Sequence, residues 1–277
     1  MKLCKTCRSK KRMNRITTTK TKSKKLWKKG FHTHSEFPKN KKPDLNKIKI
    51  IKPVDADIQV NIDMGPDYAH RYVYYYASLP SKKCVTIKQW DAAYRDFENS
   101  GISKMDKDGK ATLHIQRPQV YIEDMVTYFP HIHFLLTNRD NSKWINKLYT
   151  KGVVIKITKK EVKKHIKSGC SMILNALPFQ YYVKNRIPNS MPLPHKLVGS
   201  KLTEKDVDNY LRKMVVHYPK IHQALMKKKI TLKQIPIITY CYDSGCNASY
   251  KLMNKLWLMG YSNIVEYPGG IMGWMQN

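Results

Sequence analysis

Cys241 is the residue whose position in the chain best suits chemistry. It follows an apolar run, residues 235–240, and a short glycine-containing loop separates it from residues 248–259, which have a helical pattern. Where a buried strand passes through such a loop into a helix, the loop N–H groups and the helix N-terminus converge on one point. Because these dipoles stabilise a thiolate, a thiol at that point has a lowered pKa. The sequence therefore predicts a reactive cysteine at position 241, in a cradle that also suits a persulfide, a sulfate-like oxyanion or a phosphate.

Cys246 supplies a second thiol in the same loop, and its role has two interpretations. In one, it resolves a persulfide or sulfenic acid on Cys241 by forming a disulfide within the loop. In the other, it is a small residue packed beneath the start of the helix. The chain has six cysteines and no signal-peptide pattern, so free thiols are expected rather than a disulfide scaffold.

His131 and His133 form a second pair of residues suited to chemistry. They lie in residues 130–136, a predicted strand. Side chains two positions apart on a strand face the same side, so both imidazoles can bind one metal ion. The alternative is a pair of strand histidines that face solvent or remain from a degenerate site.

The elements that position these residues fall into two regions. Residues 46–150 are expected to be β-rich, with strands at 72–77, 111–116 and 130–136, a short helix at 86–99, and a hairpin-type turn at Asp108 and Gly109. Residues 151–277 alternate between strands, at 153–157, 172–176, 235–240 and 264–267, and helices, at 159–167, 178–185, 203–218, 220–228 and 248–259. Thr158 is expected to cap the first of these helices and Gly169 to end it. The alternation predicts a parallel sheet with flanking helices.

Four segments in order resemble the rhodanese-like (sulfurtransferase) domain, over residues of about 153–277. They are I-T-K-K-E-V-K-K-H-I (157–166), N-R-I-P-N-S-M-P-L-P (185–194), I-I-T-Y-C-Y-D-S-G-C-N-A-S (237–249) and M-G-Y-S-N-I-V-E-Y-P-G-G-I-M-G-W (259–274). The resemblance implies an α/β rhodanese-like fold that needs no cofactor and a catalytic Cys241 that carries sulfur as a persulfide. It also implies an active loop made of Tyr242, Asp243, Ser244, Gly245, Cys246 and Asn247. An active member would be a thiosulfate-type sulfurtransferase, whose sulfur donor and thiol acceptor the sequence does not identify.

The loop departs from the C-x-x-G-x-R pattern of that family. It is one residue longer, and Asp243 adds negative charge near its mouth, which disfavours thiosulfate. Asn247 stands where the pattern has an arginine that grips an oxyanion. The missing arginine also argues against the chemistry of the related dual-specificity phosphatases. The alternative for the whole loop is an inert remnant on a structural module.

Residues of about 68–150 resemble the intradiol ring-cleavage dioxygenases. The segments D-K-D-G-K-A-T-L-H-I-Q-R-P-Q-V-Y (106–121) and F-P-H-I-H-F (129–134) carry this resemblance. It implies a transthyretin-like β-sandwich for the domain at 46–150 and a non-haem iron held by Tyr121, His131 and His133. Imidazole and phenolate suit ferric iron. Tyr128 replaces the arginine of that pattern, and a second tyrosine ligand has no clear match.

Residues 1–45 are lysine-rich and indicate a basic, disordered arm and linker. The net charge is +32, from 52 basic and 20 acidic residues. A chain this basic attracts nucleic acid or other polyanions through counterion release, unless the lysines serve only solubility. Within the arm, Cys4 and Cys7 have zinc-ligand spacing, but His32 and His34 are too close together for the usual finger, which favours incidental thiols.

Three functional hypotheses of different class follow from these patterns. The first is a sulfurtransferase or sulfur carrier in a strongly basic, polyanion-binding protein. The second is a catalytically degenerate structural or nucleic-acid-associated protein, in a virion if the chain comes from a large DNA virus. The third is a non-haem iron dioxygenase-like protein. No segment has the apolar length of a membrane span, so a soluble, intracellular protein is expected.

Overall fold

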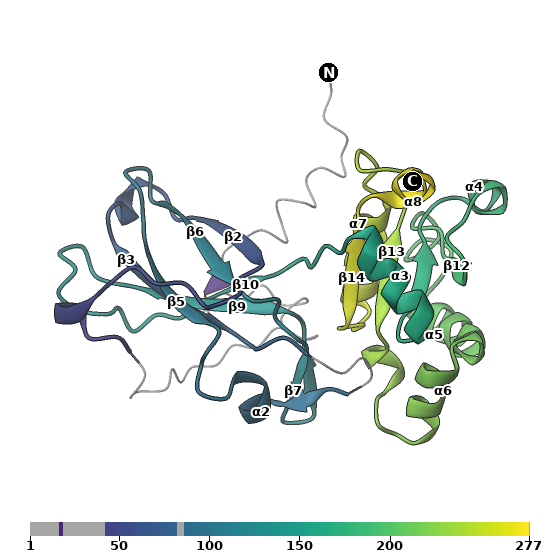
Figure 1. The fold of residues 1–277 in the computed structure, drawn as a ribbon, viewed down its shortest axis with the longest axis horizontal. Helices are drawn as coiled ribbons and strands as arrows, with labels where there is room; N and C mark the ends of the chain where they lie inside the picture. The colour runs from purple at the N-terminus through teal and green to yellow at the C-terminus, as the bar shows by residue number, and fades with distance from the viewer. Residues whose placement is uncertain (1–16, 19–41, 82–85, 277) are drawn as a thin grey trace. The chain divides into compact units, whose positions relative to one another are not determined.

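The computed structural model describes residues 17–18, 42–81 and 86–276 (Figure 1). The chain divides into two compact units, Met1–Ser81 with Lys88–Val153 and Lys82–Ile87 with Val154–Asn277. Most of the expected basic arm lies outside the described residues, and so do the four candidate zinc ligands at positions 4, 7, 32 and 34. In the described part of the chain, no helix has the length and apolar character needed to cross a membrane.

The first unit is β-rich, as predicted, and most of its strand pairs are antiparallel. Its five-stranded sheet has the order β1 (Thr17–Thr18), β10 (Tyr149–Gly152), β9 (His131–Leu136), β3 (Tyr72–Ala77) and β5 (Ser100–Lys104). Two smaller sheets are β2 (Ile58–Asp63) with β6 (Lys110–Ile115), and β4 (Lys88–Gln89) with β7 (Tyr121–Glu123) and β8 (Val126–Tyr128). Short helices complete this unit at η3 (Leu45–Lys47), η4 (Pro66–Tyr68) and α2 (Trp90–Tyr94). All six residues of β9 are buried, so both faces of the large sheet are covered there.

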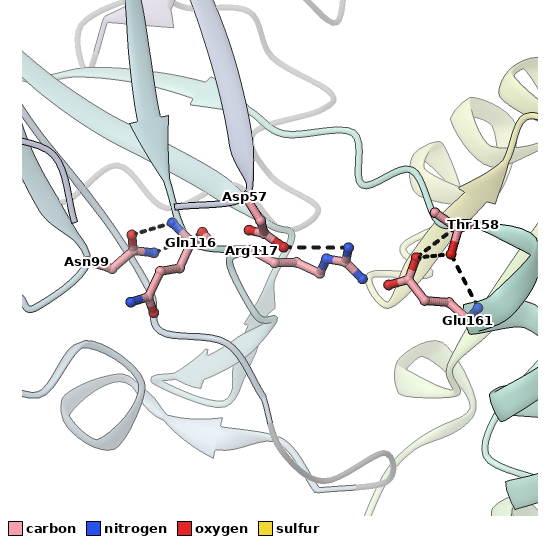
Figure 2. A network of polar contacts seen from close by, with 6 residues as sticks. All are labelled: Asp57, Asn99, Gln116, Arg117, Thr158 and Glu161. Atoms are coloured by element: carbon pink, nitrogen blue, oxygen red, sulfur yellow. Dashed lines mark hydrogen bonds and ion pairs between the residues drawn. The ribbon is translucent and has the colours of Figure 1, made fainter. Parts of the chain in front are cut away.

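Two contacts tie the β5 and β6 segments together, although the strands belong to different sheets. The Asp106 carboxylate accepts the N–H groups of Asp108 and Lys110, at 2.9 and 2.8 Å, and shapes the predicted turn. The second contact joins Asn99, which precedes β5, to Gln116, which follows β6. The Asn99 side chain donates to the Gln116 carbonyl at 3.0 Å and accepts the Gln116 N–H at 2.8 Å (Figure 2). The turn is therefore present, but it connects two sheets instead of the two strands of one hairpin.

The second unit is built on a four-stranded parallel sheet with the order β12 (Ser190–Pro192), β11 (Met172–Asn175), β13 (Ile237–Tyr240) and β14 (Ile264–Tyr267). Its helices are α3 (Lys159–Ser168), α4 (Phe179–Lys184), α5 (Glu204–Met214), α6 (Pro219–Met226), α7 (Ala248–Leu258) and α8 (Gly270–Met275), with short helices η5 (Val215–His217) and η6 (Leu232–Gln234). Figure 1 shows the helices flanking the strands. The predicted α/β class is confirmed.

The prediction of an opening strand at residues 153–157 is wrong, because the structure has no regular strand there. Lys156 makes one isolated bridge to Glu266 of β14, and the Ile157 N–H donates to the Glu266 carbonyl at 2.9 Å. The segment is extended but pairs with β14 over too short a length to form a strand. The helix that follows matches the prediction: Thr158 and Glu161 form a capping box (Figure 2), and Gly169 ends α3 with φ +63°.

Candidate functional site

The loop that joins β13 to α7 lies at the carboxyl edge of the parallel sheet. Cys241 follows directly after β13, and the start of α8 forms hydrogen bonds with the backbone of the loop. The Ile271 N–H donates to the Cys241 carbonyl, and the Met272 N–H donates to the Tyr242 carbonyl, both at 2.9 Å. Gly270 permits this approach because a Cβ atom there would lie 2.4 Å from the carbonyl carbon of Tyr242. The closing P-G-G segment therefore fixes the position of the thiol loop.

The Cys241 side chain is fully buried and lies mostly among hydrogen-bond acceptors. Its Sγ atom is 3.2 Å from the Cys246 carbonyl and 3.3 Å from Ser249 Oγ. Ser249 in turn donates to the buried carboxylate of Glu266 at 2.8 Å. A hydroxyl has one proton, so Ser249 meets Cys241 as an acceptor. This arrangement stabilises the protonated thiol of Cys241.

The pKa of Cys241 moves opposite to the direction expected from the sequence. The hydrogen bond that it shares with Cys246 raises this pKa most, and burial raises it further, although the contacts of the sulfur with the Ser249 side chain and with the Ser249 backbone amide lower it. The sequence predicted that the loop amides converge on Cys241, and the structure does not show this arrangement.

The amides converge on Cys246, which is only half-buried. The Cys241 thiol donates to the Cys246 sulfur, and the backbone N–H groups of Tyr242 and Ala248 also point at it. The Cys241 hydrogen bond first, and then these amides, lower the pKa of Cys246 to about 6, against an opposing effect of burial. The loop thus has one protonated, buried thiol and one accessible thiolate.

Asp243 directs its carboxylate into the loop. One oxygen, Oδ1, accepts the N–H groups of Gly245 and Cys246 at 3.0 and 2.9 Å. A rhodanese-type anion cradle would use loop amides of this kind, and here two of them already face a negative charge. Asn247 immediately precedes α7 but makes no side-chain capping bond. Tyr242 is exposed, as is Ser244.

Two residues of this site escaped the sequence reasoning. Ser249 and Glu266 are both buried under the loop, yet Glu266 lies on β14, in a segment valued only as a closing strand. A carboxylate in an otherwise apolar strand was the available signal. In the described part of the chain, Cys241 and Cys246 are free thiols, whereas Cys170 is disulfide-bonded, so the expectation of free thiols is wrong for Cys170.

Comparison with protein families identifies this unit. The rhodanese-like domain model matches residues 158–277. This segment is a rhodanese-like domain. Among solved structures, a human single-domain sulfurtransferase is 14% identical, with a TM-score of 0.30, and covers 44% of this chain and 96% of its own. A Saccharomyces cerevisiae single-domain sulfurtransferase is also 14% identical, with a TM-score of 0.32, and covers 44% of this chain and 89% of its own. A comparison with curated proteins returned no similar sequence.

The rhodanese-like domain accounts for the C-terminal unit only. Nothing in the comparisons supports the resemblance of the first unit to intradiol dioxygenases. Within residues 42–81 and 86–276, no group of three or more His, Cys, Asp or Glu side chains is arranged so that it could hold a metal ion. The three residues named by that resemblance nevertheless lie together in the β-rich unit.

Tyr121, His131 and His133 are buried and meet at their polar tips. The Tyr121 hydroxyl is 3.2 Å from His131 Nε2, which is 3.0 Å from His133 Nε2. His131 Nδ1 faces the Phe129 carbonyl at 2.5 Å, and a carbonyl only accepts, so Nδ1 carries the proton and Nε2 presents its lone pair. His133 Nδ1 is 2.8 Å from Thr150 Oγ1. Both imidazoles are thus oriented through Nδ1, with Nε2 directed at the shared point.

Proposed function

We propose that the rhodanese-like domain is a sulfur carrier whose two-thiol loop accepts sulfane sulfur as a cysteine persulfide and passes it to a thiol acceptor. The observation that carries this proposal is the pair of free thiols in the loop after β13, where Cys241 is buried and Cys246 is half-exposed beside thiol and amide donors. A persulfide is more acidic than a thiol and gains from the same donors. The alternative is a structural module without this reactivity.

The donor that best suits this loop is a small persulfide, R–S–SH, and not thiosulfate. Thiosulfate brings a sulfonate group that needs free amides or a cationic side chain. The Asp243 carboxylate already accepts two loop N–H groups, and Asn247 supplies no charge. A persulfide donor needs no oxyanion cradle, so Asp243 does not oppose it.

The test is a single-turnover reaction of the full chain with glutathione persulfide or with thiosulfate, followed by intact-protein mass measurement. We expect a gain of one sulfur atom from the persulfide and a much slower gain from thiosulfate. Asp243→Asn is the matched variant, because its amide oxygen can still accept both N–H groups while the charge is gone. It should accelerate the thiosulfate reaction and leave the persulfide reaction unchanged. If neither donor adds sulfur to the protein, the structural alternative holds.

We propose a second, separate function for the first unit, the binding of a metal ion by Tyr121, His131 and His133. Two nitrogens bound at right angles, each about 2.1 Å from a metal, are about 3.0 Å apart, which equals the Nε2 separation here. Metal-bound histidines usually donate their other N–H to an oxygen, and Phe129 and Thr150 supply such oxygens. The donor set suits ferric iron, which would supply Lewis acidity.

Tyr94 is a further phenol beside these three residues. It is fully buried, and its ring packs edge-on against Tyr121 with centroids 5.2 Å apart. Elemental analysis of the purified protein, with a visible band from iron-bound tyrosinate, tests the site. His133→Ala should lose the metal and the band, whereas Tyr128→Phe, which changes a phenol stacked on Tyr121, should keep both. A wild-type protein that binds no iron or other transition metal would rule the site out.

A further inference from the structure

We propose that Cys246 is the sulfur-accepting nucleophile of this loop and that Cys241 is its positioning residue, a buried hydrogen-bond donor. This inference rests on the proposed sulfur-carrier function and reverses the roles that the family pattern implies. It depends on three features of the loop: the access of each thiol to solvent, the direction of the hydrogen bonds, and the donation of the Ser249 proton to Glu266.

Access separates the two thiols first. Cys241 has no exposed surface, and the Cys246 carbonyl and Ser249 hydroxyl close around its sulfur. A donor molecule cannot reach this sulfur without displacing the loop backbone. Cys246 is only half-buried, so a donor can approach it directly.

The hydrogen bonds then assign the protonation states. Glu266 accepts the Ser249 proton at 2.8 Å, which leaves the Ser249 oxygen facing the Cys241 sulfur as an acceptor. The neighbouring carbonyls of Asp243 and Cys246 are also acceptors, at 3.7 and 3.2 Å. With acceptors on these sides, Cys241 keeps its single proton, which it shares between the carbonyl and the sulfur of Cys246. The Cys246 sulfur, by contrast, receives donors from Cys241, Tyr242 and Ala248.

The transfer step needs no oxidant or reductant. The Cys246 thiolate attacks the outer sulfur of R–S–SH, a bond forms between the two sulfurs, and the donor S–S bond breaks. The products are Cys246–S–SH and R–S⁻. Cys241 keeps its proton throughout and donates it as a hydrogen bond to the negative sulfur. Transfer onward to an acceptor thiolate reverses these bonds, with the Cys246 thiolate as leaving group.

The decisive experiment is iodoacetamide labelling of the full native chain across pH, read by peptide mass spectrometry. A protease that cleaves before aspartate cuts at Asp243 and so places the two thiols on different peptides. We expect Cys246 to react first, with a midpoint near pH 6, and Cys241 to react only after unfolding. At pH 7 a thiol of pKa 6 is about 30 times more ionised than one of the ordinary pKa of about 8.5.

Variants at Cys241 test its positioning role. Cys241→Ala removes the donor and should move the Cys246 midpoint towards the ordinary value, whereas Cys241→Ser restores a donor and should bring it back down. With glutathione persulfide, the added sulfur should lie on Cys246 in the wild type and in Cys241→Ser, and be absent in Cys246→Ser. Sulfur on Cys241 in the Cys246→Ser chain, or first labelling at Cys241, would overturn the assignment. If no sulfur is added but the labelling profile holds, the sulfur-carrier proposal fails and the assignment of the thiolate stands.

Discussion

Replacing Gly270 by alanine should displace the thiol loop and destabilise the rhodanese-like domain. Gly270 has φ +61°, and an added Cβ would lie 2.4 Å from the carbonyl carbon and oxygen of Tyr242 and 2.6 Å from the Asp243 nitrogen. The left-handed backbone alone costs alanine about 1–2 kcal/mol. Overpacking against a backbone that cannot rotate away adds about 1–3 kcal/mol. The expected loss is therefore about 2–5 kcal/mol in the free energy of unfolding.

Gly260→Ala is the matched control, because Gly260 has φ +87° in the same domain but nothing within 4 Å of an added Cβ. It should lose only the backbone part, about 1–2 kcal/mol. Denaturant unfolding measures both losses, and iodoacetamide labelling of Cys246 reports on the loop. Gly270→Ala should also slow that labelling at pH 7, and Gly260→Ala should not. Equal losses of stability in the two variants, with unchanged labelling in both, would refute the close approach of α8 to the loop.

Three further predictions concern other parts of the chain. Thr158→Ala removes the capping box with Glu161 and should cost the rhodanese-like domain about 1 kcal/mol in thermal or denaturant unfolding, whereas Thr158→Ser should cost little; an unchanged alanine variant would contradict this. Asn99→Ala leaves the Gln116 backbone groups without their buried partner and should cost the first unit about 2 kcal/mol or more in the free energy of unfolding. Hydrogen exchange should then be faster at β5 and β6, and protection that is unchanged in both strands would contradict this. Binding of nucleic acid stays a prediction from the charge of +32, and its affinity should fall steeply with added salt; affinity that salt leaves unchanged would contradict an electrostatic mode.

The order of elements in the C-terminal unit was largely predictable because local signals agree there. Thr158, Glu161 and Gly169 mark both ends of α3, and an apolar run marks β13. In the first unit, β3 and β9 were also found from their own sequence. The helix expected at 86–99 covers only Trp90–Tyr94, and it ends early because Arg95 and Phe97 adopt positive φ, which no local pattern indicates. Sheet membership was less accessible, since β6 pairs with β2 and not with β5.

The chemistry of the site was only partly predictable, for a physical reason. The sequence identified the loop and both thiols, but which thiol ionises depends on rotamers and burial. Ser249 and Glu266, brought together from α7 and β14, decide the direction of the hydrogen bonds around Cys241. Likewise Tyr121 and the histidine pair were identified by pattern, whereas the contact of Tyr94 with Tyr121 required the packed core. Contacts between distant segments carry information that spacing along the chain does not.

The most direct measurement of the central claim is the mass of the native protein before and after one equivalent of glutathione persulfide, with the added sulfur assigned by cleavage at Asp243. The account predicts one added sulfur atom, located on the peptide that carries Cys246 and removed by a thiol acceptor. A protein that gains no sulfur, while its native Cys246 still alkylates readily at neutral pH, would contradict the claim that this loop is a sulfur carrier.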